Sequence, residues 1–352
     1  MKKVLLFILV AASLLSMASA YNTPAGGENL FELSSPDALS GKQSVTGGAI
    51  FSVGSDSLTV NPALGAGEQR VNLNVGYTFL HSGNSENSSV IGSAFQTGIL
   101  IPVKMFVFSG YMNGTFIPFN EMYLGNSMNF KAGLSKEITD KLDVGLGING
   151  GVSWGGETDW SLSANLGFNY NYGDLGFLHD FRYGISMLNL GKNYSKSNFV
   201  GIKNDIKVSP FPTLGTIKAG VAASLYKNDL INVGMALDIS TAFFQNLMID
   251  ANAQISIKDM FVVSLGEKFN MVETVNKKFN FAPSVGISFK FSFDVKNNNY
   301  LDRNGWNESE MTVSSAYKNM YGTVNAVSVG ADIDLGMEDT SAPVIKFLDE
   351  EE

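Results

Sequence analysis

The alternation of hydrophobic and polar positions is clearest just after Arg70. From Val71 to Phe79 every odd position is apolar and every even position is polar or glycine. A period of two predicts a β-strand with one apolar and one polar face. We therefore expect a protein built from two-faced strands, because the pattern returns in residues 142–149, 161–170, 231–240, 247–257, 284–293 and 327–335.

The length of these stretches separates two kinds of β-protein. A soluble β-sandwich also alternates, but its strands usually have about 5 to 6 residues, whereas a tilted strand that crosses a bilayer needs about 9 to 11. The stretches here reach that second length, and their polar face consists mostly of Asn, Ser, Gly and Asp. The pattern predicts an all-β fold, a transmembrane antiparallel β-barrel, rather than a secreted sandwich or solenoid. Aromatic residues near the strand ends fit an interfacial girdle: Tyr77, Phe79, Trp154, Trp160, Tyr170, Tyr172, Phe243 and Phe244.

The connections between strands support the same fold, because bacterial barrels have short periplasmic turns and longer external loops. If the chain forms about fourteen strands, the long connections fall on one side of the membrane and the short ones on the other. We expect an even number of strands, about twelve to sixteen. Two features do not fit. The polar stretch 294–309 is long where a short turn is expected, and 308–320 alternates so weakly that it could be helical. The predicted strands are 70–80, 93–102, 105–116, 128–138, 142–154, 160–172, 181–190, 214–226, 230–241, 246–257, 260–270, 280–293, 310–320 and 323–336.

Composition agrees with a membrane barrel. Of 352 residues, 45% are hydrophobic but only 16% are charged, below the roughly 25% of soluble domains. The 37 glycines and the Ser and Asn residues then belong to the lumen wall, and the apolar residues to the lipid-facing surface. A net charge of −9 argues against nucleic acid as a partner. The absence of Cys excludes disulfides, thiolate metal sites and a cysteine nucleophile.

The N-terminus carries an export signal. Lys2 and Lys3 precede an apolar run over residues 4–15, and Ala18-Ser19-Ala20 offers a cleavage site, which predicts a signal peptide over residues 1–20. Residues 21–69 differ from the predicted barrel, 70–336, in showing little sustained alternation. After residue 336 the chain ends in an acidic segment, 337–352, which we interpret as a solvated periplasmic tail.

Three places in the chain, taken in their order, resemble a known family. A run Gly54-Ser55-Asp56-Ser57 followed by Asn61-Pro62-Ala63, placed before the first strand, resembles the N-terminal hatch, or plug, of the long-chain fatty acid transporters (FadL-like outer-membrane proteins). The passage 184–191 with Pro212, and the passage 306–331, resemble the PorV-like and uncharacterised spirochaete branches of that family. The resemblance covers nearly the whole mature chain and implies a fourteen-strand barrel with a hatch over residues 21–69.

The resemblance also implies a function: passive uptake of hydrophobic molecules such as long-chain fatty acids across the outer membrane of a diderm bacterium. Asn61, Pro62 and Ala63 would form the gate loop. Gly110 and Gly114 would mark a kink in the third strand through which substrate leaves sideways, although packing on the plug would explain that irregular strand equally well. The implied partners are outer-membrane lipid, a hydrophobic small-molecule ligand and, during biogenesis, the barrel assembly machinery. No protein partner is indicated.

Two other functions remain open from the sequence. A structural or protein-secretion-associated barrel is the PorV-like alternative, and the small polar lumen face also suits a general porin. An enzyme is not expected: the two histidines, His81 and His179, lie far apart in the chain, and neither has a neighbouring nucleophile system. We also expect no cofactor and no metal site, because no ligand motif has the required spacing.

Overall fold

The computed structural model places fourteen antiparallel strands within the part of the chain that it describes, which is residues 30–83, 90–118, 125–155, 158–192, 194, 215–242, 246–271, 274, 281–294, 308–320 and 324–336. The strands are β1 Val71–Ser82, β2 Ile91–Val103, β3 Phe106–Ile117, β4 Gly125–Thr139, β5 Leu142–Trp154, β6 Asp159–Leu175, β7 Leu178–Lys192, β8 Thr216–Lys227, β9 Ile231–Ala242, β10 Asn246–Ile257, β11 Phe261–Asn270, β12 Ser284–Asp294, β13 Glu308–Met320 and β14 Val324–Leu335.

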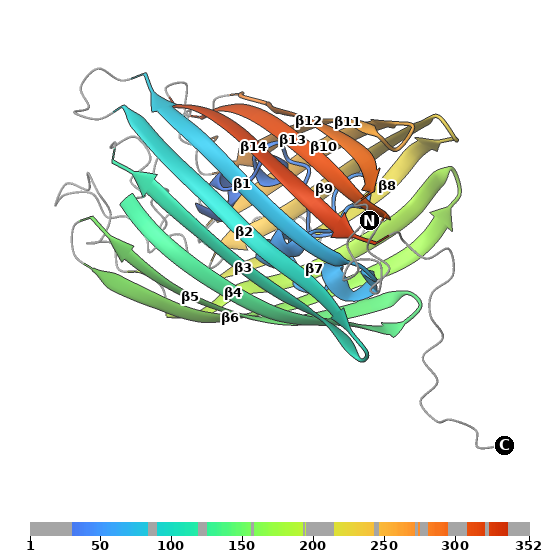
Figure 1. The fold of residues 1–352 in the computed structure, drawn as a ribbon, viewed down its shortest axis with the longest axis horizontal. Helices are drawn as coiled ribbons and strands as arrows, with labels where there is room; N and C mark the ends of the chain where they lie inside the picture. Colours follow the sequence, from blue (N-terminus) through green and yellow to red (C-terminus); the bar gives the residue numbers. More distant parts are fainter. Residues whose placement is uncertain are drawn as a thin grey trace, which may run out of the picture.

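Each strand pairs with its sequence neighbours, and β1 pairs with β14, so the sheet closes into a barrel (Figure 1). We call the end where β1 begins the turn end and the end where β1 finishes the loop end. The predicted fold class and strand number are confirmed. The segment that could have been helical is strand β13, which pairs with β12 and β14 through most of its length.

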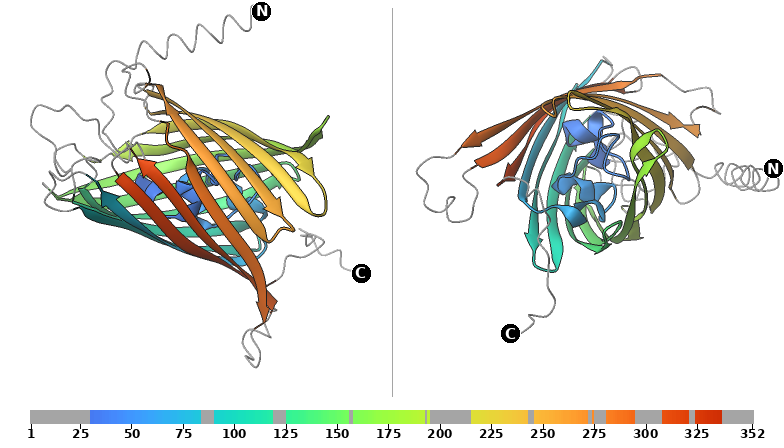
Figure 2. Two further views of the ribbon diagram at one scale, coloured as in Figure 1. Left: turned by 90° about the horizontal axis from the view of Figure 1, so that it is seen from above. Right: turned by 90° about the vertical axis from the view of Figure 1, so that its right-hand side faces the viewer.

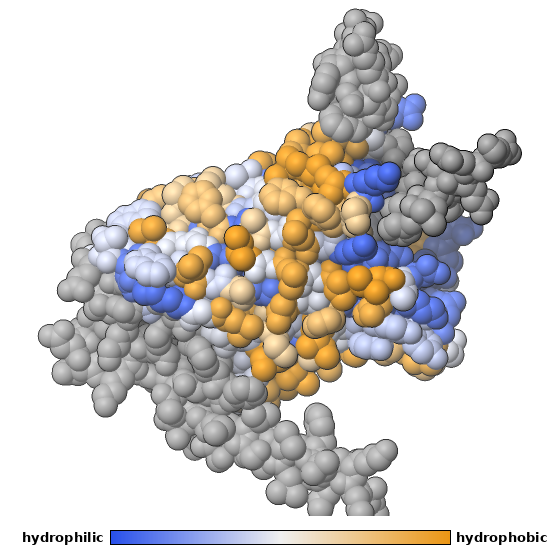
Figure 3. Space-filling model, turned by 90° about the horizontal axis from the view of Figure 1, so that it is seen from below, coloured by the Kyte–Doolittle hydropathy of each residue, from blue (hydrophilic) through white to orange (hydrophobic). Residues whose placement is uncertain are grey.

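The outer surface follows the predicted alternation. On β1 the outward residues Val75 and Tyr77 are about half exposed, whereas the inward residues Asn74 and Thr78 are buried. Figure 3 shows apolar side chains gathered across the middle of one face of the barrel. An apolar band of this kind on a closed barrel is suited to lipid, because no backbone edge is left unpaired.

Aromatic rings cluster at both ends of the strands. Phe116 contacts Phe95 and Trp154 near the loop end, with ring centroids 6.2 and 6.0 Å apart. Near the turn end Tyr170 stacks on Tyr183 with centroids 5.0 Å apart. Two separated aromatic clusters agree with girdles at two membrane interfaces.

Residues 30–67 form the plug, which lies inside the barrel in the end-on view of Figure 2. Its short elements are η2 Leu30–Leu33, α2 Pro36–Leu39, η3 Ser55–Thr59 and η4 Leu64–Gly67. Helix α2 begins where the Ser35 hydroxyl accepts a hydrogen bond from the Ala38 N–H at 3.1 Å, and Pro36 occupies its first turn, where no N–H is needed. Short elements of this kind let the chain turn repeatedly within a narrow lumen.

In the described residues, no helix has both the length and the apolar character needed to cross a membrane. The predicted signal peptide 1–20, the first residues of the predicted hatch, most of the 294–309 connection and the tail 337–352 lie outside the described residues.

Candidate functional site

The plug contacts the wall through a ring of inward-facing glycines. In eleven of the fourteen described strands, a Cβ added to such a glycine would meet a plug atom within 4 Å. Because glycine has no side chain, it lets another backbone approach closely. We call this ring the glycine collar: Gly76, Gly98, Gly133, Gly145, Gly147, Gly167, Gly184, Gly220, Gly234, Gly266, Gly286 and Gly330.

The predicted gate loop is seated on this collar. The Asn61 amide donates to the Val45 carbonyl at 2.7 Å and to the Phe168 carbonyl of β6 at 3.1 Å. Its own oxygen accepts from the Ala63 N–H at 3.0 Å. Asn61 and Ala63 are fully buried, and Pro62 lies against Gly145 and Gly167. The loop is therefore fixed to β5 and β6, and its side chain bonds to backbone on both the plug and the wall.

Two charged wall residues, which the sequence analysis did not single out, hold the neighbouring turn of the plug. Arg182 of β7 donates to the carbonyls of Thr46 at 2.8 Å and Gly48 at 2.5 Å. Asp238 of β9 accepts from the Val45 N–H at 2.8 Å. In the sequence, these two residues are recognisable only as charges at inward positions of a strand. The alternation of the strand does not show which plug atoms they will contact.

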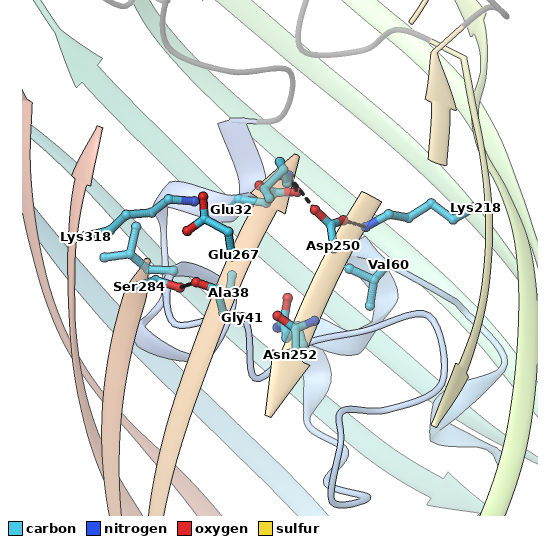
Figure 4. Close-up of a pocket in the computed structure, with 14 residues that line it drawn as sticks. Glu32, Ala38, Gly41, Val60, Lys218, Asp250, Asn252, Glu267, Ser284 and Lys318 are labelled. Atoms are coloured by element: carbon cyan, nitrogen blue, oxygen red, sulfur yellow. Dashed lines mark hydrogen bonds and ion pairs between the residues drawn. The ribbon is translucent and has the colours of Figure 1, made fainter. Parts of the chain in front are cut away.

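A small pocket lies between the plug and strands β8 and β10 to β13. Leu39 and Val60 of the plug give it an apolar side, and wall residues give it a charged side. Figure 4 shows Lys318 and Lys218 reaching in from opposite sides toward Glu32, Glu267 and Asp250. The pocket therefore combines apolar and ionic surfaces, as an amphipathic ligand would require.

The three lysines of the pocket differ in the number and length of their ion pairs. Lys268 Nζ binds both carboxylate oxygens of Glu32, at 2.7 and 2.5 Å, and lies 3.7 Å from an Asp250 oxygen. Lys218 also lies 3.7 Å from Asp250. Among the described residues, no carboxylate lies within ion-pair distance of Lys318, although Glu32 acts on it electrostatically. Lys318 is thus the cation of the pocket with capacity to bind an added anion.

Glu32 belongs to the plug, and the lysines around it determine its pKa. Burial on its own would raise the pKa of Glu32, but the positive charges of Lys268, Lys218 and Lys318 lower it to about 2. The carboxylate therefore stays ionised over the physiological range, which ties η2 to the wall through Lys268.

The inner wall becomes apolar toward the loop end. Leu80 of β1, Ile117 of β3 and Val324 of β14 face inward there and are fully buried. They form one cluster with Leu33 and Leu39 of the plug. Leu39 also lines the pocket, so the apolar cluster and the charged pocket adjoin each other.

Gly110 and Gly114 of β3 face outward rather than toward the plug. Phe95 lies over Gly114, and Ile99 and Phe108 lie next to Gly110. Strand β3 pairs with β2 and with β4 without a register shift. The two glycines therefore mark no break in the paired wall, and neighbouring side chains cover them as aromatic residues often cover strand glycines.

The two histidines do not come together. His81 lies on the outward side of β1, and His179 of β7 lies 3.5 Å from exposed Asp174 at the turn end. Among the described residues, no three histidine, cysteine or acidic side chains are grouped to hold a metal ion.

Solved structures similar to this chain are outer-membrane channels. The CymD monoaromatic hydrocarbon channel matches with a TM-score of 0.54 and 10% identity, over 89% of this chain and 100% of that chain. The P. putida toluene transporter TodX matches with a TM-score of 0.50 and 10% identity, over 89% and 99% of the two chains. A Pseudomonas aeruginosa FadL homologue has a TM-score of 0.45 at 10% identity, over 90% and 98%.

No protein-family model matches the sequence, and no curated protein matches it. The chain has the fold of the CymD and TodX barrels. The family resemblance predicted from the sequence is thus confirmed at the level of the fold.

Proposed function

We propose that this protein lies in the outer membrane of a diderm bacterium and takes up hydrophobic molecules passively, with the plug as its gate. The observation that carries the proposal is the apolar cluster inside the loop end, which shares Leu39 with the pocket. Its fold is also that of two channels whose names describe hydrocarbon or toluene passage. Because these apolar residues are buried against the plug, the wall would offer a hydrophobic solute a favourable surface once the plug moves.

The pocket supports long-chain fatty acids as a substrate class. A hydrocarbon chain would lie against Leu39 and Val60, which bound the apolar side of the pocket. A carboxylate would meet Lys318, because Glu32 already occupies Lys268. Such a charge-assisted hydrogen bond contributes about 1.5 to 3 kcal/mol, which favours an acid over a hydrocarbon of the same length.

The gate in this proposal is the plug, and Asn61, Pro62 and Ala63 are the loop through which its movement would be controlled. Asn61 bonds the plug to itself and to β6, so a shift of this loop would loosen both at once. Exit through β3 would instead require its two unshifted ladders to part, and we therefore place the gate at the plug.

The test is ligand binding by purified protein in detergent, with Lys318→Gln compared with wild type. We expect the Kd for a long-chain fatty acid to rise about tenfold or more, as the loss of one charge-assisted hydrogen bond implies. The Kd for the corresponding neutral alcohol should stay within about twofold. Lys192→Gln, an exposed lysine of β7 far along the wall from the pocket residues, is the matched control. Equal, unchanged affinities for both ligands in Lys318→Gln would contradict the assignment of the pocket.

The two alternatives predict different lumens. A general porin needs a water-filled channel, but the plug buries inward polar residues on every side of the lumen, among them Asn72, Asn165 and Ser284. Steady large conductance in a planar bilayer would overturn the plugged state. The secretion-associated alternative depends most on the acidic tail, 337–352, which lies outside the described residues.

A further inference from the structure

A group of carboxylates joins the plug to the wall in the turn half of the barrel. Asp37 of α2 pairs with Lys42 at 2.7 Å. Asp56 of η3 and Asp332 of β14 both approach Gly54: one carboxylate oxygen of each lies 3.2 and 3.1 Å from the position that a Cβ would take there. These two oxygens are therefore at most 6.3 Å apart. Asp56 is 4% exposed and Asp332 is half-buried, so two carboxyl groups lie near each other with little access to bulk water.

The groups around this pair carry almost no positive charge. Asp56 accepts long hydrogen bonds of 3.4 Å from the Ser35 hydroxyl and the Gln96 amide. Asp332 accepts from the Asn74 amide at 2.5 Å. From β3 the Tyr111 hydroxyl faces the pair and donates to Gln96 at 2.8 Å. Strands β1, β2 and β3 thus present neutral amides and hydroxyls.

Lys42 is the one cation that acts on Asp56 within the described part of the chain, and it already binds Asp37. Burial would lower the pKa of Lys42, but Asp37, Asp332 and Asp56 raise it overall, so the lysine stays charged. One positive charge then faces three carboxyl groups. On β14, the next inward residue, Asp334, pairs with Arg70 instead, at 3.7 Å.

Two carboxylates in a medium of low dielectric do not both ionise readily. We propose that Asp56 and Asp332 form a proton-dependent latch, in which a proton on the pair keeps η3 docked on the wall and loss of that proton releases it. The clamp of Arg182 and Asn61 on the other side of the plug donates to backbone carbonyls and stays closed. The latch does not depend on which solute the barrel carries.

The direction of the pH effect follows from Asp56. Burial, followed by the charge of Asp37, raises its pKa from 3.8 to about 6. The docked plug therefore binds more protons than the undocked plug between about pH 4 and pH 6. Docking is strongest below this range and weakens as the pH rises through about 6. A shift of about two pH units corresponds to a change of about a hundredfold in the docking equilibrium.

The chain has no cysteine, so a single introduced thiol can report the latch. Ser55 is fully buried beside Asp56, and its hydroxyl has no hydrogen-bond partner. We would label Ser55→Cys with a membrane-impermeant maleimide from pH 5 to pH 8. Dividing each rate by that of the unfolded chain at the same pH removes the ionisation of the thiol itself. Ala49→Cys, buried on the clamped side, is the matched control.

For Ser55→Cys we expect the corrected labelling rate to rise by about tenfold from pH 5 upward and to level off above about pH 6. It should stay low and flat when Asp56→Asn is added, and likewise with Asp332→Asn, because an amide in either place removes the like-charge repulsion. Ala49→Cys should show no rise. A flat profile in Ser55→Cys overturns the latch, as does an equal rise in both Asn variants. Two Asn variants are used so that poor folding of one leaves the test intact.

Discussion

The plug is held differently on its two sides. On the clamped side, which comprises β5 to β9, wall side chains bond to plug backbone: Arg182 to Thr46 and Gly48, and Asp238 to Val45. On the charged side, which comprises β10 to β14 with β1 to β3, neutral amides of Gln254 and Asn72 accept from the plug N–H groups of Ile50 and Ser55. Charged side chains of plug and wall also pair there, as Lys268 does with Glu32.

This difference determines which side responds to solution conditions. Backbone carbonyls do not titrate, and among the described wall groups that bond to plug backbone on the clamped side only Asp238 is a carboxylate. Carboxylate and lysine side chains change with protons, salt and bound ions. The clamped side is therefore suited to be a hinge, and the charged side, which contains the carboxyl pair and all of the pocket's wall residues except Lys218 of β8, is the side that can be released.

The largest loss of stability should come from adding a side chain at a collar glycine on the clamped side. In Gly145→Ala the new Cβ would overlap the Pro62 carbonyl and the Ala63 N–H, and backbone atoms have no flexible end that could move aside. We expect a loss of about 3 kcal/mol in unfolding free energy, at the upper end for overpacked sites, measured by urea unfolding in lipid vesicles. Gly286→Ala on the charged side should cost less, because its closest contacts are with the Ser40 side chain and the nearest backbone atom, the Ser315 oxygen, is 3.6 Å away.

Gly150→Ala is the control for this pair, because it lies on the same strand as Gly145 and its Cβ would have only one atom, at 4.0 Å, within reach. It should unfold like wild type. Equal destabilisation by Gly145→Ala and Gly150→Ala would show that strand propensity, not contact with the plug, explains the glycines.

The next effect tests whether the two sides open independently. Arg182→Gln removes a guanidinium that bonds to Thr46 and Gly48 and leaves buried carbonyls without donors, which costs about 1 to 3 kcal/mol for each group. We expect labelling of Ala49→Cys to rise at least tenfold at all pH values, while Ser55→Cys keeps its wild-type rate. Equal increases at both positions would mean that the plug moves as one body.

The smallest effect should come from Glu32→Gln. The Glu32 side chain is about a quarter exposed, so its ion pair with Lys268 contributes about 1 kcal/mol or less. Because its pKa is lowered to about 2, this contribution is present above about pH 4.5 and is lost only as the pH falls toward 2. The stability difference from wild type should thus be constant from pH 5 to pH 8; a difference that changes with a midpoint near 6 would assign the pH response to the wrong carboxylate.

Strand parity made most of the barrel predictable from sequence. An outward residue such as Val75 must be apolar, and an inward residue such as Asn74 must be small and polar, so each strand carries its own signature. Strand β13 was ambiguous because its inward Ala316 and Met320 are apolar. They contribute to the cluster at the loop end, and their packing there accounts for the missing alternation.

The site was less predictable. Asn61 and its neighbours could be singled out because they form a local motif, but their partners Gly145 and Gly167 could not. The pocket gathers Lys218, Lys268 and Lys318 from three strands, and only barrel closure brings them to Glu32. The sequence shows that each lysine is a charge at an inward position. It does not show which carboxylate the lysine pairs with, because that depends on how deeply the plug lies in the barrel.

Because of the glycine collar, a barrel without its plug would lack interior packing. A closed wall with side chains at all inward positions can fill or line its own interior, as in a porin. This wall lacks an inward side chain at the plug contact in eleven of its fourteen described strands, and glycine is a weak strand former on its own. The plug therefore supplies the core that the strands lack. Cutting it away would leave a barrel without its interior packing, and not an open pore of the same stability.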